Sequence, residues 1–196
     1  MAGALGLTGG VAGLSLLSVV GGVRPVKFYS EVEKPLEPGD TLVYQAGDRK
    51  GEPISPKDLK EGEPIYAYPK GKDGVRDQGR AASINSIIVV KLPDAEMVPS
   101  IERSHAPENI VALSRLCTHA GCSVLDIKGG VFPCPCHGST FGMAGEVKSA
   151  PALRALPQLP IKIEGEQLLV TQDWLEPVVG TQKDWEERHK KAKQEV

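Results

Sequence analysis

Residues 117–122, CTHAGC, and residues 134–139, CPCHGS, contain all four cysteines of the chain and two of its four histidines. We refer to these stretches as box 1 and box 2. Thiolates and imidazoles are common ligands of transition metals, so six such groups in so short a span indicate a metal site. Structural zinc usually takes four ligands with C-x2-C or H-x3–5-H spacings, and neither box has that pattern. The economical arrangement takes one thiolate and one imidazole from each box. It leaves one cysteine in each box, and these two can join in a disulfide.

The two boxes resemble the motifs C-T-H-x-G-C and C-P-C-H-G-S of Rieske iron–sulfur proteins, in particular the Rieske subunit of bacterial cytochrome bc-type complexes (quinol:cytochrome c oxidoreductases). The resemblance implies one [2Fe-2S] cluster and a disulfide, with these residues: Cys117 and Cys134 on one iron, His119 and His137 on the other, and Cys122 bonded to Cys136. Neutral imidazole replaces anionic thiolate on one iron, so the free energy needed to add an electron to the cluster is smaller than with four thiolates. The cluster is then a better oxidant than an all-cysteine one.

Two residues in and after box 2 are expected to tune the cluster. In the family, the serine that matches Ser139 donates its hydroxyl to a bridging sulfide, and a tyrosine two residues later commonly donates to the cysteine sulfur on the first iron. This chain has Phe141 at the second position, which has no hydroxyl. Hydrogen bonds to sulfur raise the potential, so we expect a lower potential than in tyrosine-bearing relatives. Such a potential suits a low-potential quinol such as menaquinol.

The chain departs from the family pattern in two other places. The family often has leucine inside box 1, where this chain has the small residue Ala120, so the docking contacts are expected to differ. Relatives also carry a proline-rich covering loop. The matching stretch, residues 149–160, keeps Pro151 but has alanine and leucine at other positions. We expect a looser cover over the cluster.

Composition favours an all-β fold and argues against nucleic-acid binding. The formal charge of −2 gives no strong field, and the chain has 22 glycines, 16 prolines and 5% aromatic residues. We predict a Rieske-type antiparallel β-sandwich over residues 41–180, with a small cluster-binding subdomain at about 115–158. Short β-branched or aromatic runs predict the strands: residues 41–44, 64–68, 83–92, 110–116, 160–163 and 167–171. Between the boxes, Gly129 and Gly130 are expected to form a turn.

The N-terminal segment 1–23 is predicted to be a transmembrane anchor. Residues 3–23 carry no charged side chain, and a helix of that length spans about 31 Å, close to the thickness of a bilayer core. Two G-x-x-x-G pairs in this segment would let another helix pack closely. A cleaved secretory signal is the alternative, but no basic residue precedes the apolar run and no A-x-A site follows it. Residues 24–40 are predicted to be a tether, and residues 181–196 a charged tail.

Two arguments about the orientation of the anchor conflict. The flanking basic residues Arg24 and Lys27 follow the apolar run, and the positive-inside rule would keep the domain in the cytoplasm. A disulfide, however, requires an oxidising compartment. We give the disulfide more weight. The prediction is therefore a single-pass protein of the bacterial cytoplasmic membrane with its C-terminal domain on the periplasmic side.

The resemblance implies an electron-transfer subunit that contacts quinol through His119 and His137. It would take one electron and one proton from quinol at its cluster and pass the electron to a c-type cytochrome. The implied partners are cytochrome b, a c-type cytochrome, quinol and membrane lipid, in a multi-subunit complex that can be dimeric. The isolated chain would be an electron carrier.

Other functions remain open from the sequence. The small Rieske subunit of an arsenite oxidase can share the boxes, and a structural zinc module is the non-enzymatic alternative. A terminal oxygenase would need a further iron site of two histidines and a carboxylate. Only His105 and His189 remain for such a site, and we expect both on the surface.

Overall fold

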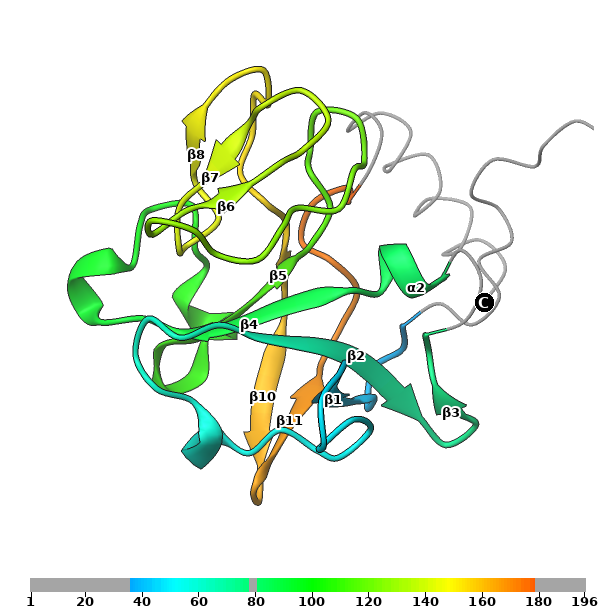
Figure 1. Ribbon diagram of the computed structural model, residues 1–196. Coiled ribbons are helices and arrows are strands. Elements are labelled where there is room, and N and C mark those ends of the chain that lie inside the picture. The colour runs from blue at the N-terminus through cyan, green and yellow to red at the C-terminus, as the bar shows by residue number, and fades with distance from the viewer. Residues whose placement is uncertain (1–35, 78–80, 179–196) are drawn as a thin grey trace, which may run out of the picture. The chain divides into compact units, whose positions relative to one another are not determined.

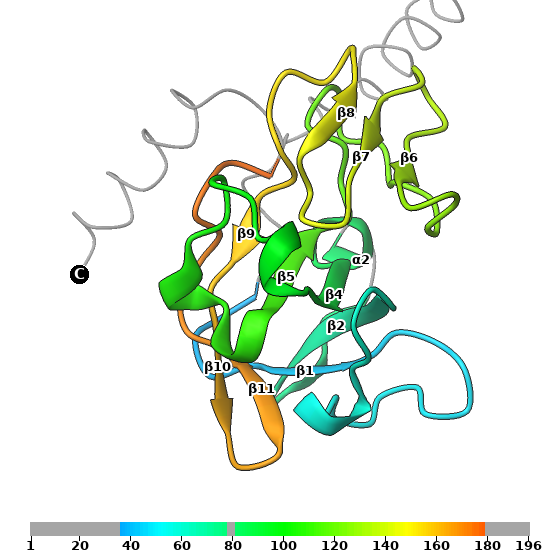
Figure 2. The ribbon, with the colours of Figure 1, turned by 90° about the vertical axis from the view of Figure 1, so that its left-hand side faces the viewer.

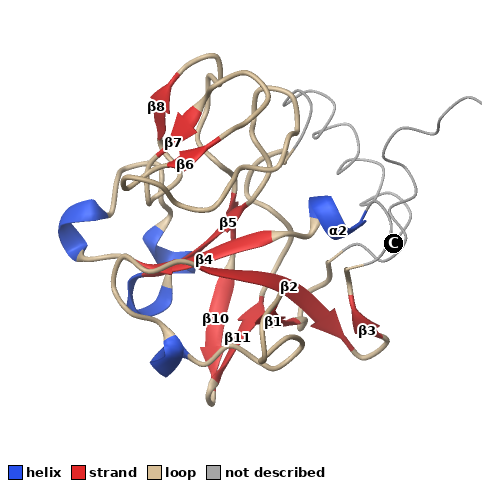
Figure 3. Cartoon of the chain, in the orientation of Figure 1, coloured by secondary structure: helices blue, strands red, loops and turns tan. Residues whose placement is uncertain are grey.

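The computed structural model describes residues 36–77 and 81–178 of the chain. Strands dominate this part, and the helical segments are single turns (Figure 3). The strands are β1 (Thr41–Tyr44), β2 (Ile65–Gly71), β3 (Gly74–Val75), β4 (Ile87–Lys91), β5 (Ile110–Ser114), β6 (Phe132–Pro133), β7 (Thr140–Phe141), β8 (Val147–Ser149), β9 (Gln158–Leu159), β10 (Ile161–Glu164) and β11 (Gln167–Val170). The helical turns are η1 (Pro56–Asp58), α2 (Ala81–Ile84), η2 (Asp94–Glu96), η3 (Arg103–His105) and η4 (Pro107–Asn109). The predicted all-β class is confirmed.

The larger sheet curls toward closure instead of forming one flat layer of a sandwich. Its strand order is β10-β11-β1-β2-β4-β5-β9, with β3 paired to β2, and every strand pair in it is antiparallel. Its two end strands, β9 and β10, are separated in the chain by Pro160 alone. The two edges of the sheet are therefore neighbours in sequence, and the strands enclose a core between them.

Strands β4 and β5 are buried on both faces, which explains their unbroken apolar sequences IIVV and IVAL. Alternate side chains of a strand point to opposite faces, so each strand contributes to two cores. Ile87 and Val89 pack into the core enclosed by the curled sheet. Ile88 and Val90 pack into a second core, which also contains Phe132 and other residues around the boxes. The second core therefore joins the large sheet to the metal-binding region.

The smaller sheet carries box 2 and consists of β6, β7 and β8 in that order. In both ribbon views it lies at one end of the domain, beyond β4 and β5 (Figures 1 and 2). It falls within the predicted cluster-binding subdomain of about 115–158. These strands were not predicted, because pairs and triplets of residues are too short to show an alternating pattern.

The strand predicted at residues 83–92 starts later in the structure than expected. Residues 83–92 were expected to be extended, but Ser83 and Ile84 end the helical turn α2, and β4 starts at Ile87. The Asn85 side-chain amide donates a hydrogen bond to the backbone oxygen of Arg76 at 3.2 Å, so a contact with a residue nine positions earlier holds the residue between this turn and the strand.

The end of the predicted tether packs against the domain. Gly39 N–H donates to the Val170 oxygen at 2.8 Å. Arg76 binds both oxygens of Asp40, at 2.6 and 3.1 Å, and both side chains are 4% exposed. A buried, two-bonded ion pair of this kind fixes the point where the chain enters β1. Gly39 and Asp40, at the end of the predicted tether, are therefore part of the domain, and residues 24–35 lie outside the described residues.

The predicted anchor at residues 3–23 and the charged tail at residues 181–196 lie outside the described residues. Within residues 36–77 and 81–178, no helix has the length and hydrophobicity needed to cross a membrane.

Candidate metal centre

The two boxes fold into loops with the same backbone hydrogen-bond pattern. In box 1, the Cys117 oxygen accepts from Gly121 N–H at 2.8 Å, and Cys117 N–H donates to the Cys122 oxygen at 2.8 Å. In box 2, Cys134 makes the equivalent bonds with Gly138 and Ser139, at 3.2 and 2.7 Å. The glycine at the fifth position of each box has a positive φ, 79° and 82°, which side chains disfavour. This shared geometry is the local reason for the glycine in both motifs.

The first cysteine of each loop is buried in the protein. Cys117 is 1% exposed and Cys134 3% exposed, and both are free thiols. Burial raises the pKa of the Cys117 thiol above its ordinary value. A metal bound there would have to displace the thiol proton, because thiolate is the binding form.

The two histidines are exposed to solvent. His119 and His137 are exposed, and their Nδ1 atoms face each other at 3.2 Å. The ring centroids are 4.7 Å apart, and the planes meet at 81°. Because Nδ1 of each ring faces the other, Nε2 is the nitrogen left for solvent or a partner. The loops thus offer two buried sulfur donors and two exposed nitrogen donors.

A disulfide joins the loops. Cys122 and Cys136, which are 14 positions apart in the chain, are bonded, and their Cα atoms are 6.5 Å apart. The sulfur of Cys134 lies within 4.8 Å of both sulfurs of this bond. These three sulfurs cannot act together as metal ligands, because two of them are bonded to each other. The thiols of Cys117 and Cys134 therefore remain as the sulfur donors.

A third segment, the covering loop of residues 149–160, is hydrogen-bonded to both boxes. Ala152 N–H donates to Ser139 Oγ at 2.9 Å, so the Ser139 hydroxyl proton is free to point elsewhere. Thr118 Oγ1 donates to the Arg154 backbone oxygen at 2.6 Å. Pro151 follows a cis peptide bond. These contacts connect the covering loop region to both boxes.

Phe141 is fully buried and pairs directly with Phe132 across β6 and β7. Its ring belongs to the core beneath the boxes. A hydroxyl added to this ring would therefore enter a buried environment near the thiols. Ala120, in contrast, is exposed beside His119.

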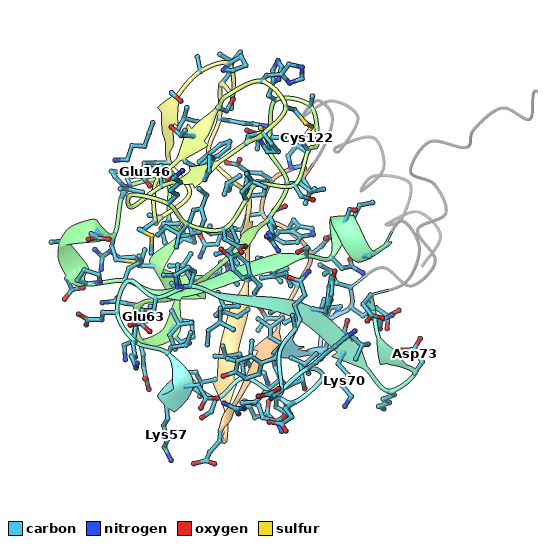
Figure 4. The ribbon with its side chains drawn as sticks, in the orientation of Figure 1. Lys57, Glu63, Lys70, Asp73, Cys122 and Glu146 are labelled. Atoms are coloured by element: carbon cyan, nitrogen blue, oxygen red, sulfur yellow. A yellow bond between two sulfur atoms is a disulfide. The ribbon has the colours of Figure 1, made fainter. Side chains whose placement is uncertain are left out.

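The structure also identifies residues that the sequence analysis missed. Thr118 and Ala152 make the covering-loop bonds, and Arg115 connects box 1 to the large sheet. For Arg115 the sequence did contain a signal: a positive charge lies directly after an apolar strand and two positions before Cys117, where it needs a polar partner close to the metal site. Thr118 and Ala152 act through partners distant in sequence, and no local pattern indicates those contacts. Figure 4 shows Cys122 in the part of the domain with the small sheet, and Lys57, Lys70 and Asp73 at the other end.

The donor set defines the class of protein. Two thiols and two imidazoles on opposed loops fit a [2Fe-2S] cluster in which two histidines replace two cysteines on one iron. A tetrahedral zinc site could use the same four atoms. It would not require the two sulfur donors to be buried and the two nitrogen donors to be exposed. The chain therefore carries the site of an iron–sulfur protein.

Comparison with known proteins gives the family. Residues 55–160 match the family model of the Rieske [2Fe-2S] domain, and the chain belongs to this family. Its cofactor is accordingly a [2Fe-2S] cluster. The chain is 34% identical to the cytochrome bc1 complex Rieske iron–sulfur subunit of Streptomyces lividans, over 65% of this chain and 78% of that protein.

Two other comparisons extend the range of relatives. The chain is 32% identical to a protein of Haloferax mediterranei that is provisionally named the Rieske subunit of a respiratory nitrate reductase. That match covers 69% of this chain and 62% of the Haloferax protein, so the chain spans less than two thirds of that relative. The crystal structure of the plasma-membrane Rieske protein of Synechocystis PCC 6803 is 28% identical, with a TM-score of 0.39, over 60% of this chain and 95% of that one.

Proposed function

We propose that this chain is the electron-transfer subunit of a cytochrome bc-type complex. It takes one electron and one proton from a quinol and passes the electron to a c-type cytochrome. The observation that carries this proposal is the pair of exposed imidazoles above two buried thiols. A proton-coupled carrier must expose the group that exchanges the proton and shield the group that stores the charge. Two relatives have names that support the same function: the cytochrome bc1 complex Rieske iron–sulfur subunit of Streptomyces lividans and the ubiquinol–cytochrome c reductase iron–sulfur subunit of Bradyrhizobium diazoefficiens.

The ligands that we propose are Cys117 and Cys134 for one iron and His119 and His137 for the other. A bound [2Fe-2S] cluster supplies a one-electron acceptor at this site. The role of the histidines follows from their geometry. An imidazole that holds a metal through Nδ1 carries its proton on Nε2, and Nε2 is the nitrogen that faces away from the other ring. Nε2 is thus the ring nitrogen that can lose or gain a proton, and when it is deprotonated a quinol hydroxyl can donate a hydrogen bond to it and transfer its proton there.

Other residues position this site. The Cys122–Cys136 disulfide holds the two ligand loops together. Ser139 Oγ accepts from Ala152 N–H, which leaves its own proton free for another acceptor. Pro151 lies in the covering loop, and Phe141 leaves the cysteine sulfur without the hydroxyl that a tyrosine would offer. Residues 3–23 are proposed to anchor the chain in the bacterial cytoplasmic membrane, with the β domain on the periplasmic side, where a disulfide persists.

A second candidate function rests on the Haloferax relative. Under that alternative the chain would transfer electrons within a respiratory nitrate reductase. The same ligand set serves both functions, so the partners distinguish them.

Purification from detergent-solubilised membranes tests the proposal. We expect the chain to copurify with b-type and c-type haem and the complex to oxidise quinol. Copurification with a nitrate-reducing enzyme and no b-type haem would support the second candidate and contradict the first.

The proton-coupled role has its own test in the same preparation. The midpoint potential should fall by about 59 mV per pH unit where one proton accompanies each electron. A midpoint that stays constant through neutral and alkaline pH would remove the proton transfer from the proposal. Replacing His119 or His137 should abolish the pH-dependent step together with the native visible spectrum.

A further inference from the structure

Three cysteine sulfurs lie close together between the two ligand loops. The sulfurs of Cys122, Cys134 and Cys136 are all within 4.8 Å of one another. Cys122 and Cys136 form the disulfide, so the free thiol of Cys134 is the neighbour of a disulfide bond. Cys117, the other free thiol, is not part of this group of three sulfurs. The two free thiols of the site therefore differ in what they can react with.

A thiol held next to a disulfide has a defined chemistry, which is thiol–disulfide exchange. The thiolate attacks one sulfur of the disulfide, forms a new bond to it and expels the other sulfur. The step needs no oxidant or reductant, because one disulfide and one thiolate are present before and after it. Two groups held in one site also react much faster than the same groups free in solution. Cys134 is 3% exposed, so reagents in solvent are excluded and the adjacent disulfide is its reaction partner.

The structure favours attack on one of the two disulfide sulfurs. Attack on Cys122 expels Cys136, which is exposed, so water can solvate the new thiolate. The new disulfide would span 12 positions, from 122 to 134, where the present one spans 14, and loop-closure entropy changes little over so small a difference. Attack on Cys136 would instead close a small ring across one residue, which disulfide geometry disfavours. The expected product is a Cys122–Cys134 disulfide with Cys136 as the free thiol.

We propose that Cys134 is a nucleophile toward the Cys122–Cys136 disulfide and that metal binding at Cys134 prevents this exchange. The inference rests on the ligand set given under the proposed function. The Cys134 thiol gives its proton to solvent, its sulfur bonds to Cys122, and Cys136 leaves as a thiolate that takes up a proton. A Cys134 sulfur that is bound to metal cannot make this attack, because its lone pair is already shared.

The consequence is a covalent switch that responds to loss of the metal. After exchange, Cys134 is locked in a disulfide and one of the four proposed ligands is missing. The chain then cannot bind a cluster again until the new disulfide is reduced. The native disulfide therefore persists only while the metal keeps Cys134 occupied.

The test follows the disulfide of the whole chain, purified in detergent with its cluster, after a chelator has removed the iron in the absence of air. Samples taken over time are quenched in acid, unfolded and treated with N-ethylmaleimide, and peptide mass spectrometry identifies the labelled cysteines. Cys117 and Cys134 should carry the label at first, and Cys117 and Cys136 later. The capacity to regain the visible spectrum with iron and sulfide should fall in parallel with the Cys134 label. Brief reduction frees Cys134 and should restore that capacity.

Two variants form a matched pair, because each removes one free thiol and one proposed cysteine ligand. Cys117→Ser keeps the attacking thiol and should contain the Cys122–Cys134 disulfide. Cys134→Ser should keep Cys122–Cys136. The opposite assignment would overturn the proposal. So would a metal-free wild type in which Cys122–Cys136 stays intact and Cys134 stays labelled, a result that does not depend on the folding of any variant.

Failure of the ligand set or of the proposed function gives different results. If Cys134 is not a ligand, the Cys122–Cys134 disulfide should form in the coloured chain before any chelator is added, and metal binding then does not control the exchange. The exchange involves neither quinol nor cytochrome. A chain that copurifies with a nitrate-reducing enzyme should therefore still show it, although the proposed function would have failed.

Discussion

The guanidinium carbon of Arg115 lies 4.2 Å from the centroid of the Tyr66 ring. Tyr66 belongs to β2 of the large sheet, and Arg115 comes two positions before the first cysteine of box 1. Arg115 also donates to the Val124 oxygen at 3.1 Å and to Asp126 at 2.7 Å. The Tyr66 hydroxyl accepts from Ile127 N–H at 3.2 Å. This pair therefore holds the segment that follows box 1 against the large sheet.

We predict that Arg115→Met lowers the free energy of unfolding by about 1–3 kcal/mol, because it removes a cation–π contact and leaves a backbone oxygen without its donor. Urea unfolding would measure the loss. Arg103→Met is the control, since Arg103 pairs with Asp94 at 3.4 Å on the surface and should change stability by less than about 1 kcal/mol. Equal losses in the two variants would contradict the role assigned to Arg115.

A hydroxyl at position 141 should raise the midpoint potential. Phe141→Tyr places that hydroxyl inside the core that contains the two free thiols, and a hydrogen bond to sulfur stabilises the reduced cluster. Potentiometric titration of wild type and variant would measure the shift. Phe132→Tyr is the matched control, because Phe132 is equally buried on the neighbouring strand. If the potential is unchanged in Phe141→Tyr, or moves equally in both variants, the missing hydroxyl does not lower the potential of this cluster.

Loss of the disulfide should destabilise the domain and loosen the ligand loops. The double variant Cys122→Ser, Cys136→Ser removes a link that spans 14 positions, and a loop of that size is worth about 3 kcal/mol in the chain-entropy model. We expect a lower unfolding midpoint in urea and faster loss of the visible cluster absorbance. Treating the wild type with a reductant should produce the same change. A double variant with wild-type stability and cluster retention would show that the loops are held by other contacts alone.

Acid should destabilise the domain partly through Asp58. Arg49 lies 3.1 Å from its carboxylate, and this hydrogen bond is the main reason that the pKa of Asp58 is below its ordinary value. A carboxyl whose pKa is lower in the folded state stabilises the protein above its unfolded pKa of about 4, and the contribution is lost as pH falls through the folded pKa. Asp58→Asn should therefore reduce stability at pH 7 and flatten its decline toward pH 2. Urea unfolding across that range would measure both, and an unchanged slope would contradict the assignment.

The sequence was sufficient for the family, the fold class and the chemistry of the donors. Metal-binding residues are recognisable because spacing within one loop is a local property, and the glycine in each box follows from the bonds that close that loop. The apolar runs of β4 and β5 were equally clear, since strands buried on both faces show no polar alternation. The start of β4 was less clear, because Asn85 before it is held by Arg76, nine positions earlier, and β6 to β8 were too short for any pattern.

Only the tertiary structure decided which distant segments meet. The bond from Thr118 to Arg154 and the contact of Arg115 with Tyr66 join positions separated by tens of residues. No local pattern contains them, because they depend on how the small sheet packs on the shared core of the large one. The amino-acid sequence specified the donor atoms, and packing of the two sheets determined that the sulfurs are buried and the imidazoles exposed.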